Sequence, residues 1–409
     1  MTVLLKKSRV IIFESTRPEN PTTGGSYISL KVIIEGLVDA GWDVVVVSYF
    51  KNPLLQFSDI DSVRNHIIPH YSLRRLLGKK VSNTATSQNK STKISLKRKL
   101  LNAMTAFTSS FFVHFFMIFN AFTLAKTIAR LGPDLVYCNT GLVNDRAIIM
   151  ASVLSKKKII CHLRNLSKLG FIDRYLSQRI TGAIFISRTV ADYYLSNSVF
   201  FKKHLVIHNA LGSNFEEQDY VQGSNILATE DKYQIAGFMR LIPWKGALTL
   251  LRAFSEFHRK GGRGILSIYG DGPLKANLMN EVLTLNLEEY VVFHGHVNDV
   301  VNQMKKSSLI VAPSDEPEPL GRTVMEAKRL GIPVIASNAG GFLETINHGY
   351  DGMLFDIGSV ESLSERMLDV YRNKELRVNL SLNGLEQSKA WSSKAYCNKL
   401  LEFVDEVCF

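Results

Sequence analysis

Short apolar runs alternate with helix-length segments along the whole chain, and this alternation is the feature that most restricts its fold. The runs are continuously apolar and are bounded by polar residues or glycine, which is typical of strands covered on both faces. The pattern predicts an α/β class with parallel sheets. The predicted buried strands are Val10–Phe13, Val44–Ser48, Leu135–Cys138, Lys158–His162, Ala183–Ile186, Leu205–Ile207, Gln234–Gly237, Ile265–Tyr269, Val291–Phe293, Leu309–Ala312 and Val334–Ala336.

A break in this pattern divides the chain into two parts. Residues Ala210–Tyr233 contain Gly, Ser, Asn and acidic residues with little apolar periodicity, which is typical of a linker. We therefore expect two doubly wound domains, at residues 1–209 and 234–389, joined by a linker at 210–233. The last segment, 390–409, has helical spacing and could cap the second domain or cross back to the first.

The charge is unevenly distributed between these parts. The formal net charge is +12, but residues 1–210 hold 29 Lys and Arg against 11 Asp and Glu, a net +18, whereas residues 211–409 hold 20 against 26, a net −6. A basic domain concentrates polyanions near it, so its partner could be nucleic acid, anionic lipid or an anionic small substrate. No basic-aromatic interleaving accompanies the charge, so we expect a membrane surface or a phosphate-bearing substrate and no nucleic acid.

The cysteines and the N-terminal residues indicate a cytoplasmic location. Cys138, Cys161, Cys397 and Cys408 form no CxxC pair, and no histidine stands at metal-ligand spacing from them beyond its chance neighbour His162. This pattern is typical of a reduced compartment. At the N-terminus, lysines interrupt an apolar run that is too short for a signal sequence, which argues against secretion.

Residues Leu100–Ala125 contain no charged side chain and are rich in phenylalanine. Three interpretations stay open for them: a long core helix, a helix with one face at a membrane interface, or a membrane span. Just upstream, basic residues lie in a Ser, Thr and Asn-rich run without acidic residues, which is typical either of a solvated loop or of a segment attracted to anionic headgroups. These basic residues are Lys79, Lys80, Lys90, Lys93, Lys97, Arg98 and Lys99.

Two glycine turns follow predicted strands. Gly24 and Gly25 open a helical pattern after the first strand, where backbone N–H groups could approach a phosphate or simply form a tight turn. Gly270 and Gly272 form the second turn, but Lys275 occupies the third glycine position of a dinucleotide fingerprint. A nicotinamide-dependent dehydrogenase is therefore disfavoured.

Charged residues gather after the strands of the second half. Arg240 and Lys245 follow the first of these strands, where they could neutralise a diphosphate. Glu318 precedes a Pro-Leu-Gly turn, and Glu326 lies eight residues further on, inside a helix that is predicted to begin near Gly321 or Arg322. The start of that helix offers free N–H groups to an anion, while the carboxylates are suited to sugar or ribose hydroxyls.

Together these motifs resemble the retaining glycosyltransferases of family 4, which have the GT-B fold of two Rossmann-like domains facing a central cleft. The resemblance covers residues 232–352 in order and spacing and only scattered points of the N-terminal half, among them His162 with Arg164. The glycine that usually precedes the arginine is displaced to Gly237, and Leu320 replaces a frequent aromatic. The matching residues are Arg240, Lys245-Gly246, Gly270-x-Gly272, Pro313-Ser314, Glu318-x7-Glu326, Gly331-x-Pro333-Val334-Ile335, Gly340-Gly341 and Glu344.

The resemblance implies a role for each matching position. Arg240 and Lys245 would bind the diphosphate, Glu318 would contact the donor sugar, and Glu326 would hold the ribose hydroxyls. His162 would reach the sugar from the N-terminal domain. The remaining positions would contact the donor through their backbone: Gly24 and Gly25 at the diphosphate, Val297 near the base, and Gly321, Arg322 and Thr323 at the distal phosphate. The resemblance also favours a C-terminal helix that crosses back to the first domain.

The expected function is transfer of a sugar from a UDP- or GDP-sugar to an acceptor hydroxyl with retention at the anomeric carbon. No metal or other cofactor is expected, because Asp59-Ile60-Asp61 lies away from the donor motifs. The basic first domain suggests a lipid-linked glycan acceptor in surface polysaccharide biosynthesis, at the inner face of the cell membrane. A nucleotide-sugar epimerase of the same fold and a catalytically silent membrane-associated partner are the alternatives.

Overall fold

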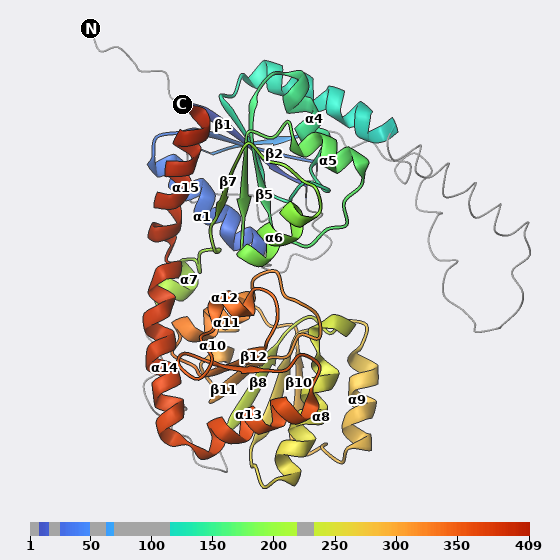
Figure 1. Cartoon of the computed structure of the whole chain (residues 1–409), viewed down its shortest axis with the longest axis vertical. Helices are drawn as coiled ribbons and strands as arrows, with labels where there is room; N and C mark the ends of the chain where they lie inside the picture. The colour runs from blue at the N-terminus through green and yellow to red at the C-terminus, as the bar shows by residue number, and fades with distance from the viewer. Residues whose placement is uncertain (1–7, 16–24, 50–62, 69–114, 219–232) are drawn as a thin grey trace, which may run out of the picture.

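The computed structural model describes residues 8–15, 25–49, 63–68, 115–218 and 233–409. They form two α/β domains, one above the other in Figure 1, each built on a parallel sheet with helices on both faces. The predicted α/β class with two Rossmann-like sheets is therefore confirmed. Gly24, Asp59–Asp61 and the basic run Lys79–Lys99 lie outside the described residues.

The sheet of the N-terminal domain has the order β3-β2-β1-β4-β5-β6-β7. Continuous Val and Ile runs form its central strands, because both of their faces are covered. One face packs against α1 (Gly25–Asp39) and α15 (Ser393–Cys408), and the other is covered by a helix over 115–131 and by α4 (Arg146–Leu154), α5 (Phe171–Ser177) and α6 (Arg188–Ser196). The strands are β1 (Arg9–Glu14), β2 (Asp43–Ser48), β3 (Arg64–Ile67), β4 (Leu135–Cys138), β5 (Lys158–Leu163), β6 (Gly182–Phe185) and β7 (Lys203–Val206).

The sheet of the C-terminal domain has the order β10-β9-β8-β11-β12-β13. Its strands are β8 (Gln234–Phe238), β9 (Ile265–Tyr269), β10 (Val291–Gly295), β11 (Leu309–Ala312), β12 (Val334–Ser337) and β13 (Met353–Phe355). Its helices are α8 (Ala247–Arg259), α9 (Lys275–Thr284), α10 (Val300–Met304), α11 (Arg322–Arg329), α12 (Phe342–Thr345), α13 (Val360–Arg372) and α14 (Lys374–Ser388). In such a sheet, ligands bind beyond the carboxyl ends of the strands, and those ends face the N-terminal domain in Figure 1.

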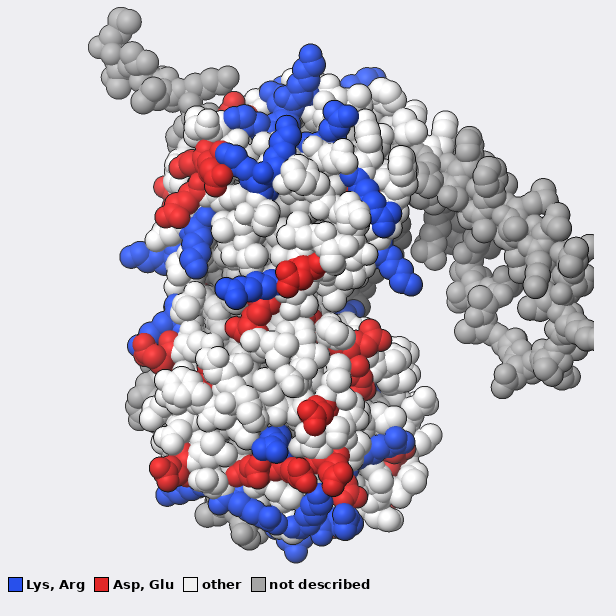
Figure 2. Space-filling view, viewed as in Figure 1, with Lys and Arg blue, Asp and Glu red and all other residues white. Residues whose placement is uncertain are grey.

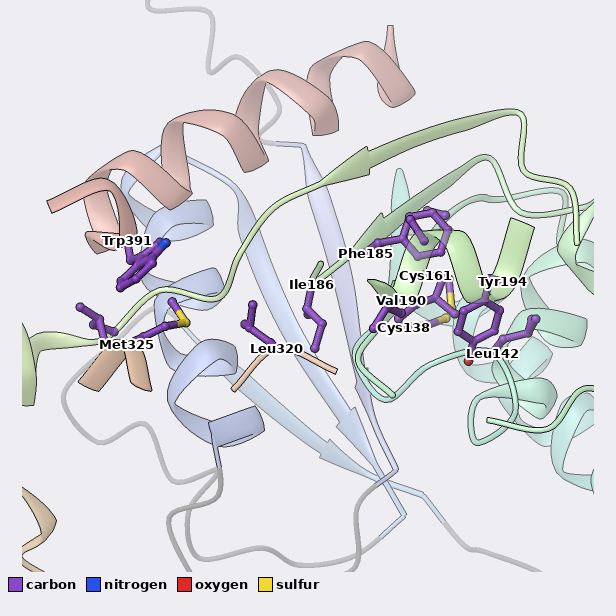
Figure 3. Close-up of a cluster of buried hydrophobic side chains, with 14 of the residues drawn as sticks. Cys138, Leu142, Cys161, Phe185, Ile186, Val190, Tyr194, Leu320, Met325 and Trp391 are labelled. Atoms are coloured by element: carbon purple, nitrogen blue, oxygen red, sulfur yellow. The ribbon is translucent and has the colours of Figure 1, made fainter. Parts of the chain in front are cut away.

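The domains are joined by more than the linker, which contains the short helix α7 (Ser213–Glu216). α15 runs back along the N-terminal domain, and its Tyr396 and Leu400 are buried in the same cluster as α1. A second apolar cluster continues from one domain into the other. In Figure 3, Leu320 lies between Ile186 of the N-terminal domain and the pair formed by Met325 and Trp391. Leu320, which replaces a frequent aromatic, is thus part of the contact between the domains.

The helix over 115–131 covers the described part of the charge-free segment. Ala121, Leu124 and Ile128 are buried in the core of the N-terminal domain, whereas Phe119 and Phe122 are exposed. Within the described ranges, no helix is long and apolar enough to cross a membrane. On the face shown in Figure 2, Lys and Arg predominate over the N-terminal domain, while Asp and Glu form a band across the C-terminal domain.

Candidate active site

A cavity of about 410 Å³ lies between the domains at the carboxyl ends of the C-terminal strands. It brings together six of the residues singled out in the sequence, and the N-terminal domain supplies Arg164, Asn165 and Asn209 to the opposite wall. The six residues are Arg240, Lys245, Glu318, Gly321, Arg322 and Thr323. The segments that follow β8 and β11 meet here because these two strands are neighbours in the sheet.

Lys245 and Glu318, which both line this cavity, form an ion pair. The Lys245 ammonium donates to Glu318 Oε1 and lies 4.3 Å from the centre of the Trp244 ring, while Ser314 Oγ donates to the same carboxylate oxygen at 2.8 Å. Gly340 has a positive φ of 61°, and a side chain there would collide with the Glu318 backbone. The glycine therefore lets the loop after β12 hold Glu318 in place.

Arg240 lies on the exposed wall of the cavity. Its backbone is fixed between Met239 N, which donates to Tyr269 O at 2.9 Å, and Leu241 N, which donates to Asp271 O at 2.9 Å. Among the described residues, no ion pair occupies the Arg240 guanidinium. The Arg240 guanidinium is therefore available to an incoming anion, on a backbone that is held in place.

The N-terminus of α11 points into the same cavity. Its N-cap residue Gly321 has φ 85°, and a side chain there would collide with the Phe342 ring. The first N–H groups of the helix, at Arg322 and Thr323, have no acceptor within the helix and favour an anion. The Arg322 side chain points elsewhere: it donates to the linker carbonyls of Ala210 at 3.0 Å and Leu211 at 2.7 Å.

Glu326 lies one turn deeper in α11 and faces a neighbouring cavity of about 630 Å³. Its carboxylate accepts from Arg322 Nε at 2.7 Å. Burial raises the pKa of Glu326, and the Arg322 charge only partly opposes this. The predicted base-contacting residue Val297 packs against the core, while its neighbours Asn298 and Asp299 line this cavity.

α1 forms the opposite wall of the second cavity. The helix begins at Gly25, and its residues Ile28 and Lys31 line the cavity. The start of α1 therefore lies on the wall that the N-terminal domain contributes to this cavity, and Glu326 lies on the wall of the C-terminal domain. Of α11, Arg322 and Thr323 line the first cavity and Glu326 lines the second.

His162 is fully buried and does not line either cavity. Its Nδ1 lies 2.7 Å from the Tyr137 hydroxyl and 3.0 Å from Arg164, and burial together with the Arg164 charge lowers the pKa of its ring well below the usual range. The structure thus places His162 among the buried residues and outside the cavity lining, and its role as a direct sugar contact stays a prediction. Its ring supports the residue that does reach the cavity, which is Arg164.

Arg164 also lines the cavity, although the sequence named it only beside His162 and assigned it no role. Its guanidinium donates to the carbonyl and the side-chain oxygen of Asn139, at 3.0 and 2.9 Å, and to Asn209 Oδ1 at 2.9 Å. His162 lies within β5 and is covered by the core, whereas Arg164 follows the last residue of the strand and reaches the cleft. In the sequence CHLRN, Arg164 directly follows Leu163, the last apolar residue of the predicted strand region, and this position could have indicated a cation at the strand end.

We expect Arg164→Met to lower kcat/KM for sugar transfer by about a hundredfold, because it removes a fixed cation from the wall opposite Arg240. Steady-state kinetics with the purified variant measure this effect. Arg179→Met is the matched control, since Arg179 is exposed in the same domain and its side chain contacts Tyr175, away from the cavity lining. Wild-type kinetics of the folded Arg164 variant would remove this residue from the site.

Glu344 connects the two domains beside the site. Its carboxylate accepts from the backbone N–H groups of Arg188 at 2.7 Å and Thr189 at 2.9 Å, which begin α6, and it lies 3.1 Å from His208 Nε2. Burial alone would raise the pKa of Glu344, but these hydrogen bonds outweigh it and lower the pKa to about 2. The matching glutamate of the motif thus holds the domains together.

A carboxylate pair lies in the N-terminal domain, although no such pair was evident in the sequence. Glu14 at the end of β1 accepts from Asn139 Nδ2 at 2.7 Å, and Asp145 accepts from Ser15 Oγ at 2.9 Å and Thr140 N at 2.9 Å. Burial raises the pKa of Asp145 to about 7, and the Glu14 charge adds to this effect. Neither carboxylate lines the two cavities of the site.

Two parallel-sheet domains with a cleft between them have the GT-B fold, and in this cleft cations face a helix N-terminus. Residues 224–387 match the model of the family glycosyl transferases group 1. The C-terminal domain is therefore similar to the glycosyltransferases of this group.

The similar proteins agree with this assignment. An uncharacterised glycosyltransferase of Methanocaldococcus jannaschii is 28% identical over 284 residues, which are 67% of this chain and 76% of that protein. A GDP-mannose-dependent phosphatidylinositol monomannoside mannosyltransferase of Mycobacterium tuberculosis is 28% identical over 40% of this chain and 45% of its own length. The crystal structure of Anabaena HepE in complex with UDP-glucose superimposes with a TM-score of 0.73 at 19% identity, covering 97% of this chain and 99% of that one.

Proposed function

We propose that the chain transfers a hexose from a UDP- or GDP-sugar to the hydroxyl of a lipid-linked glycan, with retention at the anomeric carbon. The observation that most supports this function is the meeting of Arg240, Lys245 and the α11 N-terminus in one cavity, with Glu326 one turn deeper. The relatives named for GDP-mannose and crystallised with UDP-glucose support the donor class. The mycobacterial relative, named for a phosphatidylinositol monomannoside, supports a lipid acceptor.

In this mechanism the diphosphate leaves as a negatively charged group. Arg240 and Lys245 neutralise that charge together with the N–H groups of Arg322 and Thr323, so no metal is required. Such fixed donors stabilise the transition state more than the ground state, because the charge on the phosphate oxygen grows as the glycosidic bond breaks. Glu318 binds hydroxyls of the donor sugar, and Glu326 binds those of the ribose.

The acceptor hydroxyl loses its proton as it attacks. The departing phosphate oxygen accepts this proton on the same face of the sugar, so the new bond forms where the old one broke and the configuration is retained. Glu326 accepts hydrogen bonds and is not required to move a proton. The lipid-linked acceptor places the enzyme at the inner face of the cell membrane, in surface polysaccharide assembly.

The test begins with thermal-shift measurements of the protein against UDP-, GDP-, ADP- and dTDP-sugars, with and without EDTA, because a ligand of the native state raises its stability. A selective shift that persists in EDTA supports a metal-independent donor site. Nuclear magnetic resonance of the product then gives the anomeric configuration. An inverted product contradicts retention, and an epimerised donor formed without acceptor supports the epimerase alternative instead.

A further inference from the structure

The helix over 115–131 exposes a continuous apolar stripe. Phe115, Ile118, Phe119 and Phe122 are 53%, 44%, 47% and 57% exposed. Their spacing of three and four residues places them on one face of the helix, opposite the face that is buried in the domain core. Exposed apolar side chains that are contiguous, rather than scattered singly, indicate an interaction surface.

Basic residues continue the same stripe. Lys126 and Arg130 follow Phe122 at intervals of four residues, and both are exposed. Arg130 also contacts His66 Nε2 at 2.6 Å. The helix contains no acidic residue, so its outer face joins an aromatic half to a cationic half. This composition is typical of a helix that lies in the interface of an anionic bilayer.

Exposed phenylalanine and positive charge coincide in the same domain. Residues 1–210 have a net charge of +18, from 29 Lys and Arg against 11 Asp and Glu. Six phenylalanines are exposed in the described part of the chain, and five of them lie in the N-terminal domain; the sixth is Phe409, the last residue in the sequence. The five are Phe115, Phe119, Phe122, Phe171 and Phe200.

We propose that the outer face of the helix over 115–131 docks the protein onto an anionic lipid bilayer. The phenylalanines enter the boundary between headgroups and acyl chains, and Lys126 and Arg130 meet the phosphates. A second copy of the chain fits this face less well, because a symmetric contact would bring two stripes together that contain cations and no acidic partner. This inference rests on the proposed function, because docking on the bilayer would bring the cleft to a lipid-linked acceptor.

Vesicle co-sedimentation of the full chain tests the proposal. Wild-type protein is expected to bind phosphatidylcholine vesicles that contain phosphatidylglycerol, and to bind less when phosphatidylglycerol is omitted or salt is raised. The double variant Phe119→Gln/Phe122→Gln is expected to weaken binding by about tenfold or more, since each phenylalanine buries apolar area in the membrane. The matched control is Met279→Gln/Leu283→Gln, two exposed apolar residues on α9 of the C-terminal domain.

A second variant keeps the test decisive if the phenylalanine variant does not fold. Lys126→Gln is expected to weaken binding about fivefold at low salt, with Lys374→Gln, exposed on α14, as its control. Wild-type binding that is absent, or is unchanged in both stripe variants, overturns the proposal. A wild-type dimer that Phe119→Gln/Phe122→Gln converts to monomer also overturns it and assigns the stripe to a second copy.

The two proposals fail in different ways. The vesicle assay contains no donor or acceptor, so its result does not depend on catalysis. UDP and GDP binding, measured by calorimetry, is expected to be the same for the stripe variants and the wild type. If the wild-type protein binds neither UDP nor GDP, the proposed function is contradicted, but the conclusion from the vesicle assay is unaffected.

Discussion

Lys245→Ala is expected to lower kcat for sugar transfer by about a thousandfold, the largest effect of any single substitution proposed for this protein. The Lys245 ammonium is held against Glu318 and over the Trp244 ring, so it is already in position before a donor binds. A fixed cation stabilises the departing diphosphate without the cost of reorganising solvent. Single-turnover kinetics with saturating donor measure the chemical step separately from binding.

Glu318→Gln separates the role of the carboxylate from that of the cation. The variant keeps the shape of the side chain and a hydrogen-bond acceptor for Ser314, but loses the charge that pairs with Lys245. Lys374→Ala, exposed on the far helix α14, is the matched control and is expected to retain the wild-type kcat. Wild-type turnover by folded Lys245→Ala would exclude this lysine from the reaction. Arg240 and the α11 N-terminus would then be the groups that neutralise the departing diphosphate.

The sheets could be predicted from the sequence except at one edge of each. Every predicted strand corresponds to an observed one, including the edge strands β7 and β10. β3 and β13, which were not predicted, are edge strands in the two sheets. β3 has the sequence RNHI and is largely exposed, and β13 has only 3 residues. An edge strand is half solvated, so it does not need the apolar run that marks a central strand.

The site could be predicted where its residues lie within one contiguous motif. Glu318 and Glu326 are fixed relative to each other by the start of α11, so their spacing in the sequence already implies their arrangement. The N-terminal wall depends instead on where β5 ends, because Arg164 follows the last residue of the strand and lines the cavity, whereas His162 lies within the strand and is buried. The neighbours β1 and β4 are separated by a long stretch of chain, so the proximity of Glu14 to Asp145 could not be read from the sequence.

Lys328→Met is expected to lower the free energy of unfolding by about 3–5 kcal/mol, because it leaves a buried carboxylate without its cation. Lys328 and Asp351 are 1% and 0% exposed, and their ion pair spans 2.7 Å. The ammonium also donates to the Thr345 carbonyl and, at 2.6 Å, to Gln387 Oε1. Lys328 thereby ties the C-terminal part of α11 to α12 and α14. Urea denaturation followed by circular dichroism measures the loss.

The double variant Lys328→Met/Asp351→Asn distinguishes a lost ion pair from lost packing. Burial lowers the pKa of Lys328 to about 8 despite the opposing effect of Asp351, so keeping this charge in the interior is itself costly. Removing both charges is therefore expected to destabilise the protein less than Lys328→Met alone. Equal stability of the single and double variants would show that packing, and not the unpaired carboxylate, dominates. The N-terminus of α11 faces the cleft, so a displacement of the whole helix in Lys328→Met would also lower kcat. If kcat below the unfolding transition is unchanged while the free energy of unfolding is lower, the first turn of α11 keeps its position without Lys328.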